Sequence, residues 1–371
     1  MKRGRYFFVF LMLAVILTAC NTKMTIINTF DTEIQPPTTY KHSPKPYVKG
    51  IEDIEVYSLP FGIDGYDEME TFYEDTNNEV PSKIRLLTFN VFGTDVVDLN
   101  YNGEDIEIVI DNIASDIGAE GITTITCENI IKETNKTRIN FFATGCPDYP
   151  NGTTDLLEIN FDLKRYQFDF QLMYGEKLVN EINTWTNTIT ENNEIQALTL
   201  PTEVKQEVLK RLIFQNLLEA EGEFYTTCSA DNINSYKFIM GEREFYWNNC
   251  DHSRAAIELT NIAEYIIQQA KQKHDNHSEL IVQGYIIQVN EDSLVIGENL
   301  NILEYKQIQQ GIQDGTLDAY LYDFLELQDI NTKKFKAGDK IQATIGGEIT
   351  EGKPSIAKVK KIELIEKPIL E

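Results

Sequence analysis

The chain has 371 residues, and 42% of them are hydrophobic. That length is enough for two or three domains with buried cores, and that composition excludes a wholly disordered chain. Lys and Arg number 33 against 59 Asp and Glu, so the formal net charge is −26. Such an acidic excess argues against nucleic acid as a partner, because contacts to phosphates need a basic surface.

The first twenty residues have the segment order of an exported lipoprotein. Basic residues near the N-terminus precede an apolar run over residues 6–17, which is too short for a comfortable membrane span. The run leads into the sequence LTAC, from Leu17 to Cys20, which resembles the lipobox whose cysteine becomes diacylated. We therefore predict a lipoprotein signal peptide over residues 1–19, a lipid anchor on Cys20 and an extracytoplasmic location at the cell membrane. A plain signal peptide or an N-terminal anchor helix is the alternative.

The sequence after Cys20 is predicted to form a tether and three domains. Residues 20–50 are rich in Thr, Asn and Pro, a composition typical of a disordered, extended spacer. The predicted domains cover residues 51–163, 164–275 and 279–371. The predicted fold class is α+β, with antiparallel β-sheet domains and packed helices followed by a small OB-like β-barrel.

The first domain is predicted to be one helix packed on an antiparallel meander. Met69, Phe72 and Tyr73 fall on one face of a helix over residues 67–78. The dipeptide Asn102-Gly103 predicts a hairpin with a type I′ turn, in which both central residues have positive φ. The strand-like runs are residues 83–92, 95–101, 104–110, 121–131, 137–143 and 154–162.

The second domain combines strands with two amphipathic helices. Pro201 is expected to open the first helix, because its missing N–H has no helical partner at that position, and Gly222 to end it. Ser253 is expected to cap the second helix. The predicted strands are residues 165–174 and a hairpin of residues 236–240 and 243–247 about Gly241.

The third domain reads as a compact β unit. Five strands with one helix inserted part-way are typical of a small closed or nearly closed barrel of the OB kind. The predicted strands are residues 280–289, 293–296, 320–327, 339–349 and 357–365, and the helix covers residues 303–313.

Two parts of the chain resemble families without an established activity. Residues 82–103, SKIRLLTFNVFGTDVVDLNYNG, and residues 122–146, ITTITCENIIKETNKTRINFFATGC, look like domain of unknown function 4362, found in exported proteins of Bacillus-like bacteria. Residues 283–298, QGYIIQVNEDSLVIGE, and residues 335–349, FKAGDKIQATIGGEI, resemble domain of unknown function 3221, a lipoprotein domain with an OB-like fold. The resemblances imply an envelope lipoprotein and add no catalytic residue, because neither family has an established activity.

Four cysteines remain besides the predicted lipid site, and an even number in an exported protein favours disulfides. Directly opposed residues of a hairpin have a constant sum of residue numbers. Cys127 and Cys146 have the sum 273, the same as Lys136 and Thr137 at the expected turn. These two cysteines should therefore face each other and form a bridge.

The second predicted pair is Cys228 with Cys250. Their residue numbers sum to 478, whereas the hairpin about Gly241 requires 483. A bridge between them therefore needs a loop that folds back before the hairpin begins.

The sequence contains no G-x-S-x-G, H-E-x-x-H, P-loop or G-x-G-x-x-G motif. The S-x-x-K spacing at Ser355 and Lys358 requires a helix, but the segment reads as a strand, in which these positions point to opposite faces. His252, His274 and His277 read as solvated side chains rather than metal ligands. We predict no catalytic residue, no metal site and no cofactor.

The remaining candidates are acidic or aromatic. Carboxylates could bind calcium or act as an acid and a base, although near pairs arise by chance among 59 acids. Trp185 and Trp247 are expected in the core. The acidic candidates are Asp116, Glu120, Asp148 and Asp155.

Two functions remain open. The first is a non-catalytic envelope lipoprotein, bound to the membrane by its lipid, that interacts with an unknown protein, a wall polymer or a small ligand. The alternative is a hydrolase or transferase directed at the cell wall, with a carboxylate-based site. Buried carboxylates in a concavity would favour the enzyme, and exposed aromatic side chains would favour binding.

Overall fold

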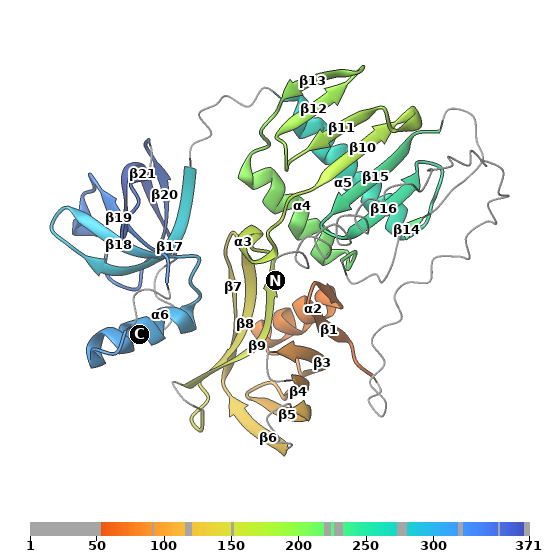
Figure 1. The fold of residues 1–371 in the computed structure, drawn as a ribbon. Coiled ribbons are helices and arrows are strands. Elements are labelled where there is room, and N and C mark those ends of the chain that lie inside the picture. The colour runs from red at the N-terminus through yellow and green to blue at the C-terminus, as the bar shows by residue number, and fades with distance from the viewer. Residues whose placement is uncertain are drawn as a thin grey trace, which may run out of the picture. The chain divides into compact units, whose positions relative to one another are not determined.

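A computed structural model of the chain describes residues 53–90, 93–115, 121–149, 152–218, 224–225, 233–272, 280–317, 322–347 and 349–366 (Figure 1). All of them belong to one compact unit, Thr39–Glu371. The predicted signal peptide, Cys20 and the predicted tether lie outside the described residues. The fold class is α+β, as predicted.

The N-terminal part contains a six-stranded sheet in the order β2-β1-β3-β4-β5-β6. Helix α2 (Tyr66–Asn77) buries Met69 and Phe72, which confirms the helix predicted there. Strands β1 and β2 were not predicted, because each is too short to show a hydrophobic alternation. The strands are β1 (Val56–Leu59), β2 (Gly62–Asp64), β3 (Ser82–Asn90), β4 (Gly93–Tyr101), β5 (Ile106–Ser115) and β6 (Gly121–Cys127).

The hairpin predicted at Asn102-Gly103 joins β4 to β5, but its predicted turn type is wrong. Tyr101 pairs with Ile106, so the loop has four residues rather than two. The side chain of Asn102 accepts hydrogen bonds from the backbone N–H groups of Glu104 and Asp105, at 2.7 and 2.9 Å. This side-chain turn widens the loop, and only Gly103 has a positive φ, 102°.

The single meander predicted for the first domain is also wrong, because the chain changes sheets near Glu128. The run predicted as one strand over residues 121–131 is split into β6 and β7, which belong to different sheets. The three-stranded second sheet has the order β7-β8-β9. Its strands are β7 (Asn129–Thr134), β8 (Arg138–Thr144) and β9 (Thr153–Asn160).

A seven-stranded sheet follows, in the order β13-β12-β11-β10-β15-β16-β14. The strand predicted over residues 165–174 begins only at Gln171, because residues 165 and 166 belong to a one-turn helix that ends where Gln167 adopts a left-handed conformation with φ 46°. The hairpin about Gly241 is confirmed, with Tyr236 opposite Trp247. The elements are α3 (Leu163–Tyr166), β10 (Gln171–Gly175), η2 (Glu176–Leu178), β11 (Asn180–Asn183), β12 (Thr188–Glu191), β13 (Glu194–Ala197), β14 (Phe224–Tyr225), β15 (Ser235–Met240) and β16 (Arg243–Asn248).

Two longer helices belong to this part of the chain. Helix α4 (Thr202–Phe214) begins after Pro201, as predicted, but ends well before Gly222 because Asn216 turns the chain with φ 52°. Helix α5 (Arg254–Lys271) begins at Ser253, whose hydroxyl accepts a hydrogen bond from the N–H of Ala256 at 3.3 Å. Both helices contribute to one apolar core with the sheet.

The C-terminal part is a closed five-stranded barrel in the order β17-β18-β19-β21-β20 (Figure 1). This confirms the prediction of a small OB-like barrel. Its interior is a separate apolar cluster that includes Ile286, Leu327 and Ile341. The elements are β17 (Leu280–Val289), β18 (Ser293–Glu298), α6 (Ile302–Asp314), β19 (Phe324–Gln328), η4 (Thr332–Lys334), β20 (Lys340–Ile345) and β21 (Ser355–Glu366).

One apolar cluster extends through both the first and the second predicted domains. It contains residues from Val56 on β1 to Ala270 on α5, including Phe141 and Trp247. The sheets on either side of residue 163 therefore share a core, whereas the barrel interior is its own cluster. The boundaries of the three domains stay a prediction.

Candidate binding groove and disulfide

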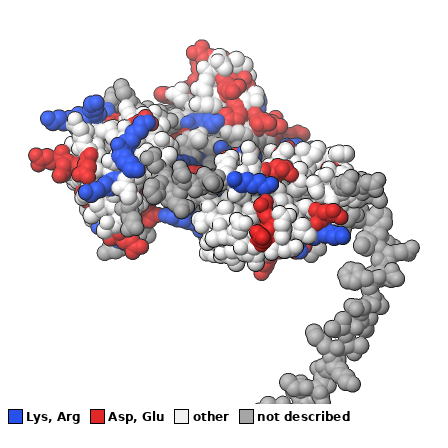
Figure 2. Space-filling model, turned by 90° about the horizontal axis from the view of Figure 1, so that it is seen from above, with Lys and Arg blue, Asp and Glu red and all other residues white. Residues whose placement is uncertain are grey.

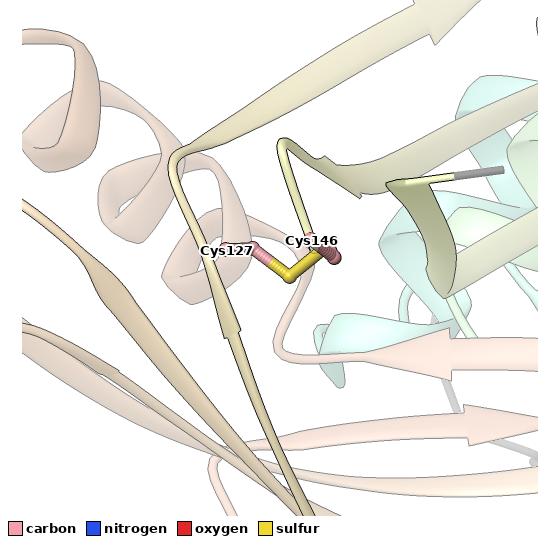
Figure 3. The surroundings of a disulfide bond; sticks show 2 residues. All are labelled: Cys127 and Cys146. Carbon is pink, nitrogen blue, oxygen red and sulfur yellow. A yellow bond between two sulfur atoms is a disulfide. The ribbon is translucent and has the colours of Figure 1, made fainter. Parts of the chain in front are cut away.

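The predicted pair Cys127 and Cys146 forms a disulfide (Figure 3). The two Cα atoms are 4.2 Å apart, and both residues are buried. Strand β7 pairs with β8 in the predicted register, since Asn129 opposes Thr144 and these numbers also sum to 273. Because Cys127 ends β6 and Cys146 follows β8, the bridge ties the six-stranded sheet to the three-stranded one.

Cys250 is disulfide-bonded as well. Strands β15 and β16 pair with the predicted sum of 483, since Ser235 opposes Asn248, so Cys250 lies just past the ladder. Cys228 lies outside the described residues, and its pairing with Cys250 stays a prediction.

The structure does not gather the other predicted site residues into one place. Asp116, Glu120, His274 and His277 lie outside the described residues. Among the described residues, no group of three His, Cys, Asp or Glu side chains is arranged to hold a metal ion. Ser355 and Lys358 lie on strand β21, as the strand prediction requires. His252 is exposed in the loop before α5.

The two tryptophans differ in environment. Trp247 is fully buried, as predicted, and its indole N–H donates to the hydroxyl of Thr260 at 2.9 Å. The prediction for Trp185 is wrong, because 47% of its surface is exposed. Trp185 lies between β11 and β12, where the side chain of Asn183 accepts hydrogen bonds from the N–H groups of Trp185 and Thr186. The turn therefore directs an aromatic side chain to solvent.

Sequence reasoning missed a groove of about 830 Å³ between helices α4 and α5. Arg211 in the last turn of α4 and Gln215 directly after it form one side, and α5 contributes a stripe at helical spacing that runs beside its apolar stripe. That polar stripe is the signal that could have indicated the groove. The lining residues are Arg211, Gln215, Glu258, Asn261, Ile262, Glu264, Tyr265 and Gln268.

A cation and an aromatic ring meet in the groove. The guanidinium of Arg211 lies 4.2 Å from the centroid of the Tyr265 ring, and its Nε donates to Glu207 at 2.7 Å. Desolvation raises the pKa of Tyr265, the negative charge of Glu207 raises it further, and Arg211 opposes both effects. The phenol is therefore neutral at physiological pH and offers a hydroxyl and a flat apolar ring.

The groove is connected to the buried sheet through Glu264. Its carboxylate accepts a hydrogen bond of 2.7 Å from the hydroxyl of Tyr236 on β15. Burial raises the pKa of Tyr236, and the bond to Glu264 raises it further. The ring of Tyr236 stacks on Trp247 with a centroid separation of 5.2 Å. Glu264 is thus linked through Tyr236 to an indole in the core.

A second polar cluster lies on the sheet β7-β8-β9, around Arg138. The guanidinium pairs bidentately with Glu304 of α6 and also contacts Glu158, at 3.4 Å. The pKa of the nearby Asp155 is raised to about 6, chiefly by desolvation and in addition by the negative charges of Glu158 and Glu304, while Arg138 opposes the shift. Asp155 is nevertheless exposed at the surface, so its carboxyl still contacts water.

The same sheet carries a buried carboxylate, Glu133 on β7. One of its oxygens accepts from Lys340 at 2.6 Å and from Tyr285 at 2.9 Å. The other oxygen accepts from the backbone N–H of Ile302, the first residue of α6, at 2.8 Å. Glu133 and Lys340 are 1% and 2% exposed, so this ion pair is shielded from solvent. Its partners come from the barrel and its helix, which fixes these elements on the sheet.

The surface carries charges of both signs. On the face drawn in Figure 2, Lys and Arg side chains are interspersed with Asp, Glu and uncharged residues. None of the described helices is long and apolar enough to cross a membrane.

The comparisons with known proteins concern the barrel. Residues 283–366 match the family model described as Protein of unknown function (DUF3221), which confirms the resemblance predicted for this part. A search of curated proteins found no match. The chain is similar to a solution structure of residues 21–120 of YobA from Bacillus subtilis, with 16% identity over 26% of this chain and 91% of that chain, and a TM-score of 0.19.

Proposed function

We propose that this protein is a cell-envelope lipoprotein, anchored by a lipid on Cys20, whose extracytoplasmic body is a non-catalytic binding module. The observation that carries the proposal is the buried Cys127–Cys146 disulfide, because structural disulfides persist in oxidising compartments outside the cytoplasm. The basic and apolar leader that ends in LTAC supports export independently. The predicted resemblance of residues 82–103 and 122–146 to domain of unknown function 4362, an exported family, would agree with this proposal, but the family match found covers residues 283–366 only.

The chemistry of the buried Glu133 and of the groove between α4 and α5 favours binding over catalysis. A general acid or base needs a carboxyl that can exchange a proton with a substrate within hydrogen-bond reach. Glu133 instead directs both oxygens at protein donors and is shielded from solvent. The groove between α4 and α5 offers many hydrogen-bonding groups on a rigid helical frame, which suits recognition.

The location is tested by replacing the lipid site. The unsubstituted protein should be found in the membrane fraction and should accumulate as an unprocessed form when globomycin blocks lipoprotein signal cleavage. Cys20→Ala should leave the membrane fraction, because no lipid is attached, and should not respond to globomycin. A matched Cys228→Ala variant should remain at the membrane. Membrane retention of Cys20→Ala would refute the proposed anchor.

The binding activity is tested with dye-labelled cell-wall sacculi. Sedimentation measures binding of the protein, and release of soluble dye measures cleavage in the same tube. We expect saturable co-sedimentation without release of dye. Release that rises with protein concentration would refute a non-catalytic module, and absence of co-sedimentation would refute a wall ligand.

One observation favours a second candidate, a cell-wall hydrolase or transferase. The pKa of Asp155, raised to about 6, lies in the range that suits a general acid at neutral pH. Its neighbour Glu158 is already engaged by Arg138 and Asn140, at 3.4 and 3.2 Å, which leaves it a poor nucleophile. This enzyme would release dye in the sacculus assay, and Asp155→Asn would abolish the release.

A further inference from the structure

The groove between α4 and α5 has the size of a ligand site. Its volume of about 830 Å³ lies within the range of roughly 300 to 1,000 Å³ that is usual for ligand pockets. Both walls are helices that share one apolar core with the sheet, so the groove is held open by elements that do not need a ligand to form.

The lining is polar and rich in carboxamides. Gln215, Asn261 and Gln268 each present a group that both donates and accepts hydrogen bonds. Ile262 is the aliphatic residue of the lining, and it is only 2% exposed. A lipid chain or an apolar peptide side chain would therefore find little apolar surface here.

The positive charge of the groove is compensated within the protein, because Arg211 is paired with Glu207. The carboxylates of Glu264 and Glu258 accept hydrogen bonds from Tyr236 and from the amide of Asn261, at 2.7 and 3.4 Å, but these neutral donors leave their negative charge in place. An anionic ligand would be repelled by these two carboxylates. The groove thus disfavours anions and offers several donors and acceptors to an uncharged ligand.

An aromatic platform completes the site. The Arg211 guanidinium lies over the Tyr265 ring, 4.2 Å from its centroid, and planar groups of this kind suit the C–H face of a sugar ring. A peptide bound by strand addition would need a free sheet edge, but the backbones of both walls are committed to helical hydrogen bonds. The lining therefore favours a saccharide over a peptide.

We propose that the α4–α5 groove binds a neutral sugar chain that carries hydroxyl and acetamido groups. The proposal rests on the proposed binding function and names its ligand class. The carboxamides and carboxylates of the groove would form hydrogen bonds with the hydroxyl and acetamido groups of the sugar. The Tyr265 ring would pack against one face of a sugar ring. The class matches the glycan part of a wall polymer.

The test is calorimetric titration of the soluble Cys20→Ala protein with a tetrasaccharide of β-1,4-linked N-acetylglucosamine. We expect saturable binding with a dissociation constant of about 1 mM or below, which corresponds to about −4 kcal/mol. Tetraglycine, which offers amides without sugar rings, should not bind. Absence of saturation by the tetrasaccharide, or equal binding of tetraglycine, would overturn the proposal.

A matched pair of variants locates the binding site. Gln268 and Gln272 are both exposed and one turn apart, but only Gln268 lines the groove. Gln268→Ala should weaken binding at least ten-fold, and Gln272→Ala should leave it unchanged. Tyr265→Ala should abolish binding, and Asn261→Ala provides a second exposed variant if Tyr265→Ala fails to fold. Equal affinity of Gln268→Ala and Gln272→Ala would place binding elsewhere and overturn the proposal.

The result of the sugar titration can be distinguished from the result of the test of the proposed function. Membrane fractionation decides the location without reference to the groove. If fractionation supports the anchor but the titration shows no binding, the glycan proposal fails and the lipoprotein proposal stands. If the anchor is refuted because Cys20→Ala stays at the membrane, titration of the detergent-extracted protein still decides whether the groove binds sugar.

Discussion

The Asp155 carboxyl links surface electrostatics to stability. Its pKa in the folded protein is raised from 3.8 to about 6, so the folded state holds a proton that the unfolded state releases. Between about pH 4 and pH 6 the native state therefore binds more protons, and the free energy of unfolding falls as the pH rises through this window. Above pH 6 Asp155 is ionised in both states, and the free energy of unfolding is lowered by the full cost of holding this charge in the folded protein.

We expect Asp155→Asn to raise the melting temperature at pH 7 and to leave it unchanged near pH 4. The amide removes the charge that desolvation disfavours and that Glu158 and Glu304 repel. Partial exposure of the side chain limits the gain, because water screens part of the repulsion. Thermal melts of both proteins from pH 4 to pH 8 check this, with Asp148→Asn in the exposed preceding loop as the control. Parallel pH profiles for the protein and Asp155→Asn would contradict it.

At the residue scale, the pairing of Cys127 with Cys146 could be predicted from the sequence, whereas the groove between α4 and α5 could not. Trp185 and Trp247 are identical side chains, and only the turn formed by Asn183 directs the first of them to solvent. Arg211 and Tyr265 are 54 positions apart in the sequence, and nothing local indicates that they stack. The groove depends on the packing of two helices, which a hydrophobic stripe predicts only in part.

At the scale of elements, the disulfide joins two sheets at the point where the chain leaves one for the other. The bond closes a loop with a sequence separation of 19. On the chain-entropy model, a disulfide that closes a loop of this size stabilises the folded protein by roughly 3 kcal/mol, because it restricts the unfolded chain.

We expect the double variant Cys127→Ala and Cys146→Ala to lower the free energy of unfolding by about 3 kcal/mol, or less if the unfolded hairpin is compact. Alanine is preferred to serine because both positions are buried and a hydroxyl would lack a partner. Urea denaturation measures the change, and the matched Cys250→Ala variant reports the separate effect of the other bridge. An unchanged midpoint in the double variant would contradict this account.

The elements that the sequence predicted well are those with a local physical signal. The caps at Pro201 and Ser253, and the constant residue sum of the hairpin that brings Cys127 to Cys146, needed only turn and cap chemistry. The failures depended on longer-range interactions. The run from Gly121 to Ile131 is uniformly strand-like, so its division between two sheets depends on partners distant in the sequence.

At the scale of the whole molecule, the pair Glu133 and Lys340 joins residues 207 positions apart. Removing one member of a buried ion pair leaves the other charge without compensation, at a cost of about 3–5 kcal/mol, whereas replacing both with apolar groups is often neutral or stabilising. The pair therefore indicates specific docking of the barrel on the sheet rather than a large net stabilisation.

We expect Glu133→Ala to destabilise the protein by about 3–5 kcal/mol, and Glu133→Ala with Lys340→Met to recover part of that loss. The recovery is incomplete because Tyr285 and the N–H of Ile302 also lose their acceptor. Urea denaturation of the single and double variants checks this, and Lys358→Met, at an exposed ion pair with Asp329, is the control. A double variant less stable than Glu133→Ala would contradict the pairing.

The Cys127–Cys146 disulfide affects how the protein responds to a pulling force. Such a force would arise if the N-terminus is anchored in the membrane while the body binds a wall polymer. Tension along the chain would pass directly between the two sulfur atoms and bypass strands β7 and β8. At about 3.5 Å per extended residue, the bypassed segment is roughly 60 Å of contour that pulling cannot release. The hairpin that supplies Glu133 and Arg138 would thus stay closed between its two cysteines while the rest of the chain is stretched.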